Sequence, residues 1–200
     1  MQSQVSAETI AAEDAMRAGL YGLLGVVLFK SPNSEILKTL QGLTGDDTEM
    51  GKAFSTLAKL AGATAPGVVR EEYDGLFIGM GRGELLPYGS YYLTGFLNEK
   101  PLAKLRNAMR ALGVARGDDV GEPEDHIGSL FEIMSGLIRG RYGPPASLTD
   151  QKTFFFDHIE PWAGHFFKDL EAAELSRLYQ PVGTIGRLFV GIESDAFEME

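Results

Sequence analysis

Asp125 and His126 are the adjacent residues whose types best suit chemistry, and they lie inside the segment Glu122-Pro-Glu-Asp-His-Ile127. A carboxylate beside an imidazole could orient a general base or hold a cationic ligand. Side chains of adjacent residues on a helix point about 100° apart, so this pair cannot form the orienting pair of a catalytic triad. No Gly-x-Ser-x-Gly nucleophile turn occurs in the chain. We therefore expect that the chain is not an enzyme.

His158 and His165 could support a second kind of chemistry, since they are seven residues apart. They share a helix face only if Pro161 leaves the helix straight. Carboxylates that could complete a hard-metal site lie nearby, at Asp157, Glu160 and Asp169. An all-helical, metal-dependent hydrolase is therefore an alternative function. The simpler interpretation is that the two histidines border an aromatic cluster, and we predict no metal site.

Gly79, Gly81 and Gly83 form a glycine-rich stretch of the kind that can bind phosphate. No strand pattern precedes it and no Gly-Lys-Ser or Gly-Lys-Thr follows it, so it does not match a nucleotide-binding loop. The stretch indicates the end of a helix and the start of a loop.

A peptide-binding site is the interpretation that uses the most residues. One helix face, the loop after it and the acid–imidazole pair would supply apolar, aromatic and acidic groups: Tyr73, Leu76, Phe77, Pro87, Tyr88, Asp125 and His126. Such a set suits an amphipathic peptide that carries basic residues, laid in a groove between helices. The alternative is that the three residues of the helix face are ordinary core.

Helices must position these residues, because apolar positions recur at helical spacing and no segment alternates as a strand does. We predict an all-α fold, a single globular domain over residues 1–200 with about nine or ten helices. In its central helix, Pro123 would occupy the first position and acids would lie at the positive end of the dipole. Pro181 should kink the last helix. Residues 1–8 should be frayed, and residues 114–121 could form a hinge loop.

The composition narrows the functional class. The 200 residues have a formal net charge of −10, which disfavours nucleic acid and favours cationic partners. The longest apolar run, Leu23 to Phe29, is too short to span a membrane, and no basic flank marks a secretory signal. With no cysteine there is no disulfide framework. These features favour a cytoplasmic protein without membrane insertion.

The same residues resemble the TorD/DmsD family of chaperones for molybdenum-containing oxidoreductases. The resemblance covers about residues 10–195 and depends on the order and spacing of its motifs. These are Tyr73-x-x-Leu76-Phe77, Pro87-Tyr88-x-Ser90-Tyr91, Glu122-Pro123-x-Asp125-His126, His158-x-x-x-Trp162 and Tyr179.

The resemblance implies an all-helical cytoplasmic chaperone that binds the twin-arginine signal peptide, and also the body, of a molybdoenzyme subunit. Binding would delay export until the molybdenum cofactor is inserted. Asp125 would hold an arginine, and His126 would bind peptide backbone or tune that carboxylate. Glu122 and Pro123 join the expected peptide-binding residues. We predict no cofactor for the chain itself.

The resemblance has three open points. Many relatives have Pro-x-Glu-Ser where this chain has Pro87-Tyr88-Gly89-Ser90, so one acid is missing, and Glu84 is the acid that could substitute. Family members have been linked to guanine nucleotide and to molybdopterin-type cofactors, but no residue here locates either. Both monomers and domain-swapped dimers are compatible with the family.

Overall fold

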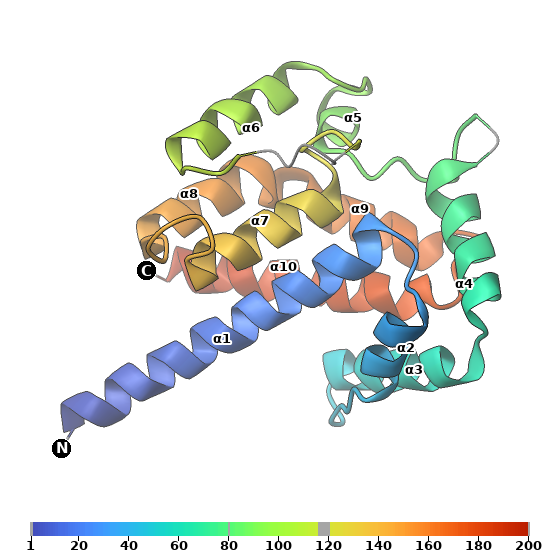
Figure 1. Ribbon diagram of the computed structural model, residues 1–200, viewed down its shortest axis with the longest axis horizontal. Coiled ribbons are helices and arrows are strands. Elements are labelled where there is room, and N and C mark those ends of the chain that lie inside the picture. The colour runs from blue at the N-terminus through green and yellow to red at the C-terminus, as the bar shows by residue number, and fades with distance from the viewer. Residues whose placement is uncertain (1, 80, 116–120, 200) are drawn as a thin grey trace.

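The apolar helical spacing of the sequence is realised as ten α-helices in a computed structural model that describes residues 2–79, 81–115 and 121–199 (Figure 1). The helices are α1 (Gln2–Phe29), α2 (Ser34–Gln41), α3 (Glu49–Ala63), α4 (Pro66–Tyr73), α5 (Gly89–Thr94), α6 (Lys100–Ala111), α7 (Ile127–Arg139), α8 (Leu148–His158), α9 (Glu160–Ala172) and α10 (Tyr179–Glu198). A π-helical turn, η1 (Asp74–Ile78), continues α4. No strand occurs among these residues, so the all-α prediction is confirmed.

The long helix α1 packs along α7, and this pair forms one half of the core (Figure 1). Nearly every side chain of α7 is buried, which its continuous apolar stripe predicts. Two glycines let the backbones touch. A Cβ at Gly128 would lie 2.8 Å from the backbone nitrogen of Phe29, and one at Gly25 would lie 3.1 Å from the carbonyl oxygen of Gly128. A side chain at either position would push the two helices apart.

Helices α9 and α10 form the other half of the core, with α3 against α10 and α2 against α3. Buried aromatic rings fill the space inside, among them Trp162, Phe166, Phe167 and Tyr179. We predicted a kink at Pro181 because a proline inside a helix removes a backbone hydrogen bond, and this reason does not hold here. Because α10 begins at Tyr179, the proline lies in the first turn, where its missing N–H removes no bond within the helix.

Two glutamates hold the turn between α9 and α10 to the α4–η1 region. Glu72 accepts hydrogen bonds from the backbone nitrogens of Arg177 (2.7 Å), Leu178 (3.2 Å) and Tyr179 (2.9 Å). Glu84 accepts from those of Glu174 (2.6 Å) and Leu175 (3.1 Å). The bonds to Glu72 satisfy N–H groups just before and at the start of α10, where the helix dipole also favours negative charge, whereas Glu84 binds the turn that follows α9. Glu84, the acid that could substitute at Gly89, is therefore already bound to this turn.

The structure can be compared with two predicted flexible segments, residues 1–8 and residues 114–121. Helix α1 begins at Gln2, so it includes most of the segment that we expected to be frayed. Within the predicted hinge loop, residues 116–120 lie outside the described part of the chain. Among the described residues, no helix is both long and apolar enough to cross a bilayer.

Candidate functional site

Two sequence motifs lie side by side at the centre of the candidate site. The backbone nitrogen of Gly89 donates to the carbonyl of Asp125 (2.9 Å), and that of Ile127 donates to the carbonyl of Pro87 (2.9 Å). Tyr88 and His126 pair between them as an isolated antiparallel bridge. We call these two segments, residues 87–89 and 125–127, the motif ladder. It joins stretches that are almost forty positions apart in the sequence.

His126 is the N-cap of α7, because its Nδ1 accepts a hydrogen bond from the backbone nitrogen of Gly128 (3.0 Å). The prediction that Pro123 begins this helix is wrong. Residues 123–126 instead form a turn, in which the nitrogen of His126 donates to the carbonyl of Pro123 (3.1 Å). The His126 ring is buried against Phe29 and Tyr88. Burial lowers its pKa from 6.5 to about 3, so the imidazole is neutral.

Asp125 has two carboxylate oxygens in different situations. Its Oδ2 accepts a hydrogen bond from the backbone nitrogen of Ser90 (2.7 Å), which attaches the start of α5 to the motif ladder. Its Oδ1 is buried and has no hydrogen-bond partner among the described residues. The side chain as a whole is only 3% exposed. A buried carboxylate oxygen without a donor is costly, and this oxygen is therefore the strongest candidate for ligand binding.

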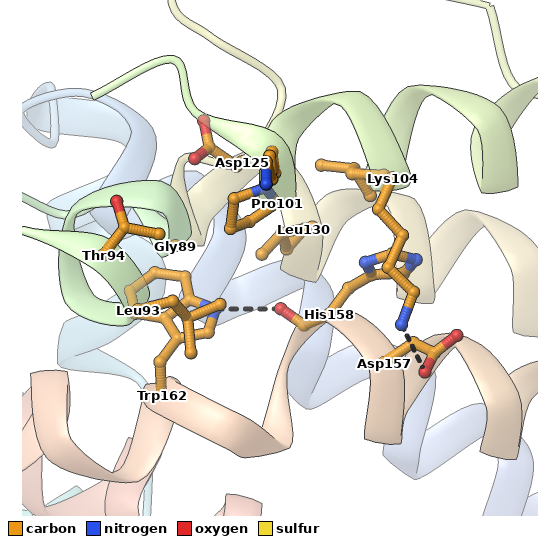
Figure 2. Close-up of a pocket in the computed structure, with 12 residues that line it drawn as sticks. Gly89, Leu93, Thr94, Pro101, Lys104, Asp125, Leu130, Asp157, His158 and Trp162 are labelled. Atoms are coloured by element: carbon orange, nitrogen blue, oxygen red, sulfur yellow. Dashed lines mark hydrogen bonds and ion pairs between the residues drawn. The ribbon is translucent and has the colours of Figure 1, made fainter. Parts of the chain in front are cut away.

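Asp125 lies on the wall of a cavity of about 430 Å³, which we call the Asp125 pocket (Figure 2). Its apolar lining comes from Leu93, Pro101, Leu105, Leu130 and Trp162, and its polar lining includes Lys100, Lys104, Asp125, Asp157 and His158. Lys104 and Asp157 form an ion pair (2.9 Å), and the indole nitrogen of Trp162 donates to the carbonyl of His158 (2.8 Å). The volume lies within the range of sites that bind small ligands or side chains.

A second cavity, the Tyr73 pocket, has a volume of about 810 Å³. Its lining includes Phe29, Arg70, Tyr73, Asp74 and Glu122.

Two tyrosines fasten the residues around the Tyr73 pocket. The hydroxyl of Tyr73 donates to the carbonyl of Phe29 (2.9 Å), and that of Tyr88 donates to Glu122. Burial raises the pKa of both tyrosines, and the Glu122 carboxylate adds to the effect. Both hydroxyls therefore stay protonated and act as donors at neutral pH.

The predicted peptide-binding residues fall into three groups. Asp125 lines one pocket, while Tyr73 and Glu122 line the other. The remaining members belong to the core or to the backbone framework between the pockets: Leu76, Phe77, Pro87, Tyr88, Pro123 and His126. Leu76 and Phe77 are buried among other core side chains, which is the alternative that the sequence left open for this helix face.

The histidines of the hydrolase alternative do not share a helix face. His158 ends α8 and is buried, whereas His165 is exposed on α9. Two of the three nearby acids already have partners, since Asp157 pairs with Lys104 and Asp169 accepts from the hydroxyl of Tyr92 (2.8 Å). No group of three metal-ligating side chains was found in the described parts of the chain. The geometry therefore does not favour the hydrolase.

Sequence reasoning missed most of the Asp125 pocket. Gly89 packs so closely on Trp162 that a Cβ there would lie 3.0 Å from the indole nitrogen. His158 lines the same cavity, and its Nε2 is buried without a partner among the described residues. The His158-x-x-x-Trp162 spacing was a signal for this wall, but it did not indicate that the wall faces Asp125.

The sequence is similar to a known protein family and to curated relatives. The model of the nitrate reductase delta subunit family matches residues 43–168. The chain is 29% identical over 177 residues to the probable Tat proofreading chaperone DmsD of Haemophilus influenzae, covering 83% of this chain and 84% of that protein. It is 25% identical over 205 residues to the chaperone protein TorD of Shewanella loihica, with coverage of 90% and 92%.

A solved structure shares the fold. It is described as a redox enzyme maturation protein from Archaeoglobus fulgidus, and it aligns with a TM-score of 0.59 at 21% identity over 88% of this chain and 94% of that chain. The family model spans more than half of the sequence, and the resemblance to TorD and DmsD is confirmed by these relatives. The chain therefore belongs to the nitrate reductase delta subunit family, together with the TorD and DmsD chaperones.

Proposed function

We propose that the chain is a cytoplasmic chaperone that binds the twin-arginine signal peptide of a molybdenum-containing oxidoreductase. In this role it delays export of the enzyme until the molybdenum cofactor is in place. Family membership supports the chaperone class, since the relatives are named as chaperones and two of them as Tat proofreading chaperones.

The observation that carries the proposal is the buried, unpartnered Oδ1 of Asp125, a residue that lines a partly apolar pocket. An arginine side chain brings N–H donors and a positive charge on an apolar stem, so it can satisfy this oxygen and pack against the walls. Hydrogen bonds to a charged partner stabilise by about 1.5–3 kcal/mol. The net charge of −10 attracts a basic peptide over longer distances.

The motif ladder gives the proposed site its extent. It contributes Gly89 and Asp125 to the Asp125 pocket, while Glu122, a few residues earlier, lines the Tyr73 pocket. We therefore expect the peptide to lie across the ladder, with one arginine in the Asp125 pocket and neighbouring residues near Tyr73 and Glu122. The peptide-binding roles of Leu76, Phe77 and His126 then become indirect, because these residues hold the ladder and the helices in place.

Calorimetric titration of the purified protein tests the proposal. The ligands are twin-arginine signal peptides of molybdoenzymes from the same genome and their Arg-Arg→Ala-Ala versions. We expect micromolar or tighter binding to one native peptide and much weaker binding to its double-alanine form. If no native peptide binds, the proposed function is rejected.

The Asp125→Asn variant tests whether Asp125 binds an arginine of the peptide. Its amide oxygen can still accept from the nitrogen of Ser90, while its NH₂ group replaces the acceptor that an arginine needs. We expect peptide binding to weaken by about 1.5–3 kcal/mol with little change in fold stability. Asp125→Ala is a poorer test, because it also leaves the buried N–H of Ser90 without an acceptor. Asp195→Asn, at an exposed site on α10, is the matched charge control.

A further inference from the structure

His158 is the second group on the wall of the Asp125 pocket with an unused hydrogen-bonding atom. The residue is 7% exposed, and its Nε2 is buried with no partner in the described part of the chain. Its ring packs on Phe154 with centroids 5.2 Å apart, and its carbonyl accepts from the indole of Trp162. The ring is therefore held in place by its surroundings, while one buried nitrogen has no hydrogen-bond partner among the described residues.

The chemistry of His158 suits acceptance of a hydrogen bond from a cation. Burial lowers its pKa to about 4, so the ring is neutral at neutral pH and can present a lone pair on one nitrogen. The adjacent acid, Asp157, pairs with Lys104 across the pocket rim. Asp125, in the turn before α7, and His158, at the end of α8, both line the cavity (Figure 2), and each has one buried polar atom without a partner among the described residues.

Exposed apolar side chains follow closely in sequence from Leu93, a residue of the pocket lining. Leu93 lines the pocket and is also 43% exposed, while Phe96 is 69% and Leu97 43% exposed. All three belong to α5 and the segment directly after it. Large apolar side chains grouped on a surface in this way are typical of binding sites.

We propose that His158 is a second recognition residue for the signal peptide, and that the apolar residues beside the bound arginine pack on Leu93, Phe96 and Leu97. A guanidinium has five N–H donors in a planar fork, so one arginine can donate to acceptors on two walls of the cavity. A lysine has all its donors on one nitrogen, so it is less suited to bind two separated acceptors at once. This inference rests on the proposed function and adds a specificity residue and an apolar track to it.

Titration of paired variants against paired peptides tests the role of His158. The variants are His158→Leu, which removes the acceptor, His158→Gln, which keeps one, and the exposed control His165→Gln. The peptides are the native twin-arginine signal peptide and versions with each arginine changed singly to alanine. Thermal unfolding of every variant checks that the fold is retained.

We expect His158→Leu to weaken binding of the native peptide about tenfold. One single-alanine peptide should show almost no further loss in this variant, since it lacks the arginine that His158 binds. His158→Gln should recover much of the affinity, and His165→Gln should leave it unchanged. Equal affinity of His158→Leu and the wild-type protein would overturn the inference, as would the same fold-loss for all three peptides.

A surface variant tests the apolar track without disturbing the core. Phe96→Ser should weaken native-peptide binding a few-fold, whereas Met16→Ser, 67% exposed on α1, should not. No effect of Phe96→Ser would reject the track.

Failure of the proposed function and failure of this inference give different results. If the wild-type protein binds no signal peptide, the proposed function fails and this inference with it. If binding depends on Asp125 but not on His158, only the inference fails.

Discussion

The turn between α9 and α10 and the Asp125 pocket use carboxylates in opposite ways. Both oxygens of Glu72 are occupied, since together they accept from three backbone nitrogens. Asp125 uses Oδ2 in the same manner on Ser90, but its Oδ1 has no partner among the described residues. A fully satisfied carboxylate only holds segments together, whereas a half-satisfied one holds segments together and also keeps an acceptor for a ligand.

The two buried histidines repeat the contrast. His126 uses its Nδ1 to cap α7, whereas the Nε2 of His158 has no partner in the described part of the protein. Leaving a buried polar atom without a bond costs about 1–3 kcal/mol, which the fold must supply from its core. Asp125 and His158 each have such an atom and line the same cavity, which indicates a binding site that stability alone does not require.

Acid should reduce stability through the two buried histidines, and this is the largest effect that we expect. His126 has a pKa of about 3 when folded and about 6.5 when unfolded, so the unfolded state binds more protons between these values. Stability is therefore highest above pH 6.5 and falls as the pH drops below it. For His126 the loss between pH 7 and pH 5 is about 2 kcal/mol. His158 adds a loss of the same sign, because burial lowers its pKa to about 4.

Urea unfolding at pH 7, 6 and 5 measures this dependence. His126→Asn can still cap α7 through its side-chain oxygen but does not titrate, so it should flatten the pH profile. His165→Gln, at an exposed position, is the control. Identical profiles for His126→Asn and the wild-type protein would show that burial of this ring does not control acid stability.

Glu72→Ala sharpens the comparison between the two carboxylates. It removes the acceptor for three N–H groups at the start of α10, so we expect a loss of about 2 kcal/mol in unfolding free energy. Signal-peptide affinity should not change. Glu71→Ala, at the exposed neighbouring position, is the matched control. A large loss of peptide affinity with intact folding would show that Glu72, like Asp125, takes part in peptide binding.

Lys104→Met should have the smallest effect on stability. Its ion pair with Asp157 is largely exposed, and such pairs contribute about 0–1 kcal/mol. At the pocket, however, the change removes a positive charge and releases a carboxylate. Titration at low and high salt should show a few-fold tighter binding of the arginine peptide, with the gain larger at low salt. Weaker binding would show that no cation occupies the Asp125 pocket.

The fold class could be predicted from the spacing of apolar residues alone. Apolar spacing indicated an all-α chain, and the stripe from Ile127 to Ile138 indicated a central core helix. The start of α7 could not be predicted, because Pro123 fits a helix start and an isolated turn equally well.

The sequence by itself also determined that Asp125 and His126 are unusual, and which family they indicate. Only the tertiary structure decided which of their atoms remain available. The donor to Asp125 is the nitrogen of Ser90, 35 residues away, and the pocket that Asp125 lines is completed by His158 from α8. Helical periodicity is encoded by neighbouring residues, so it can be read locally. Satisfaction of a buried oxygen depends on the backbone of distant segments, and no local pattern records it.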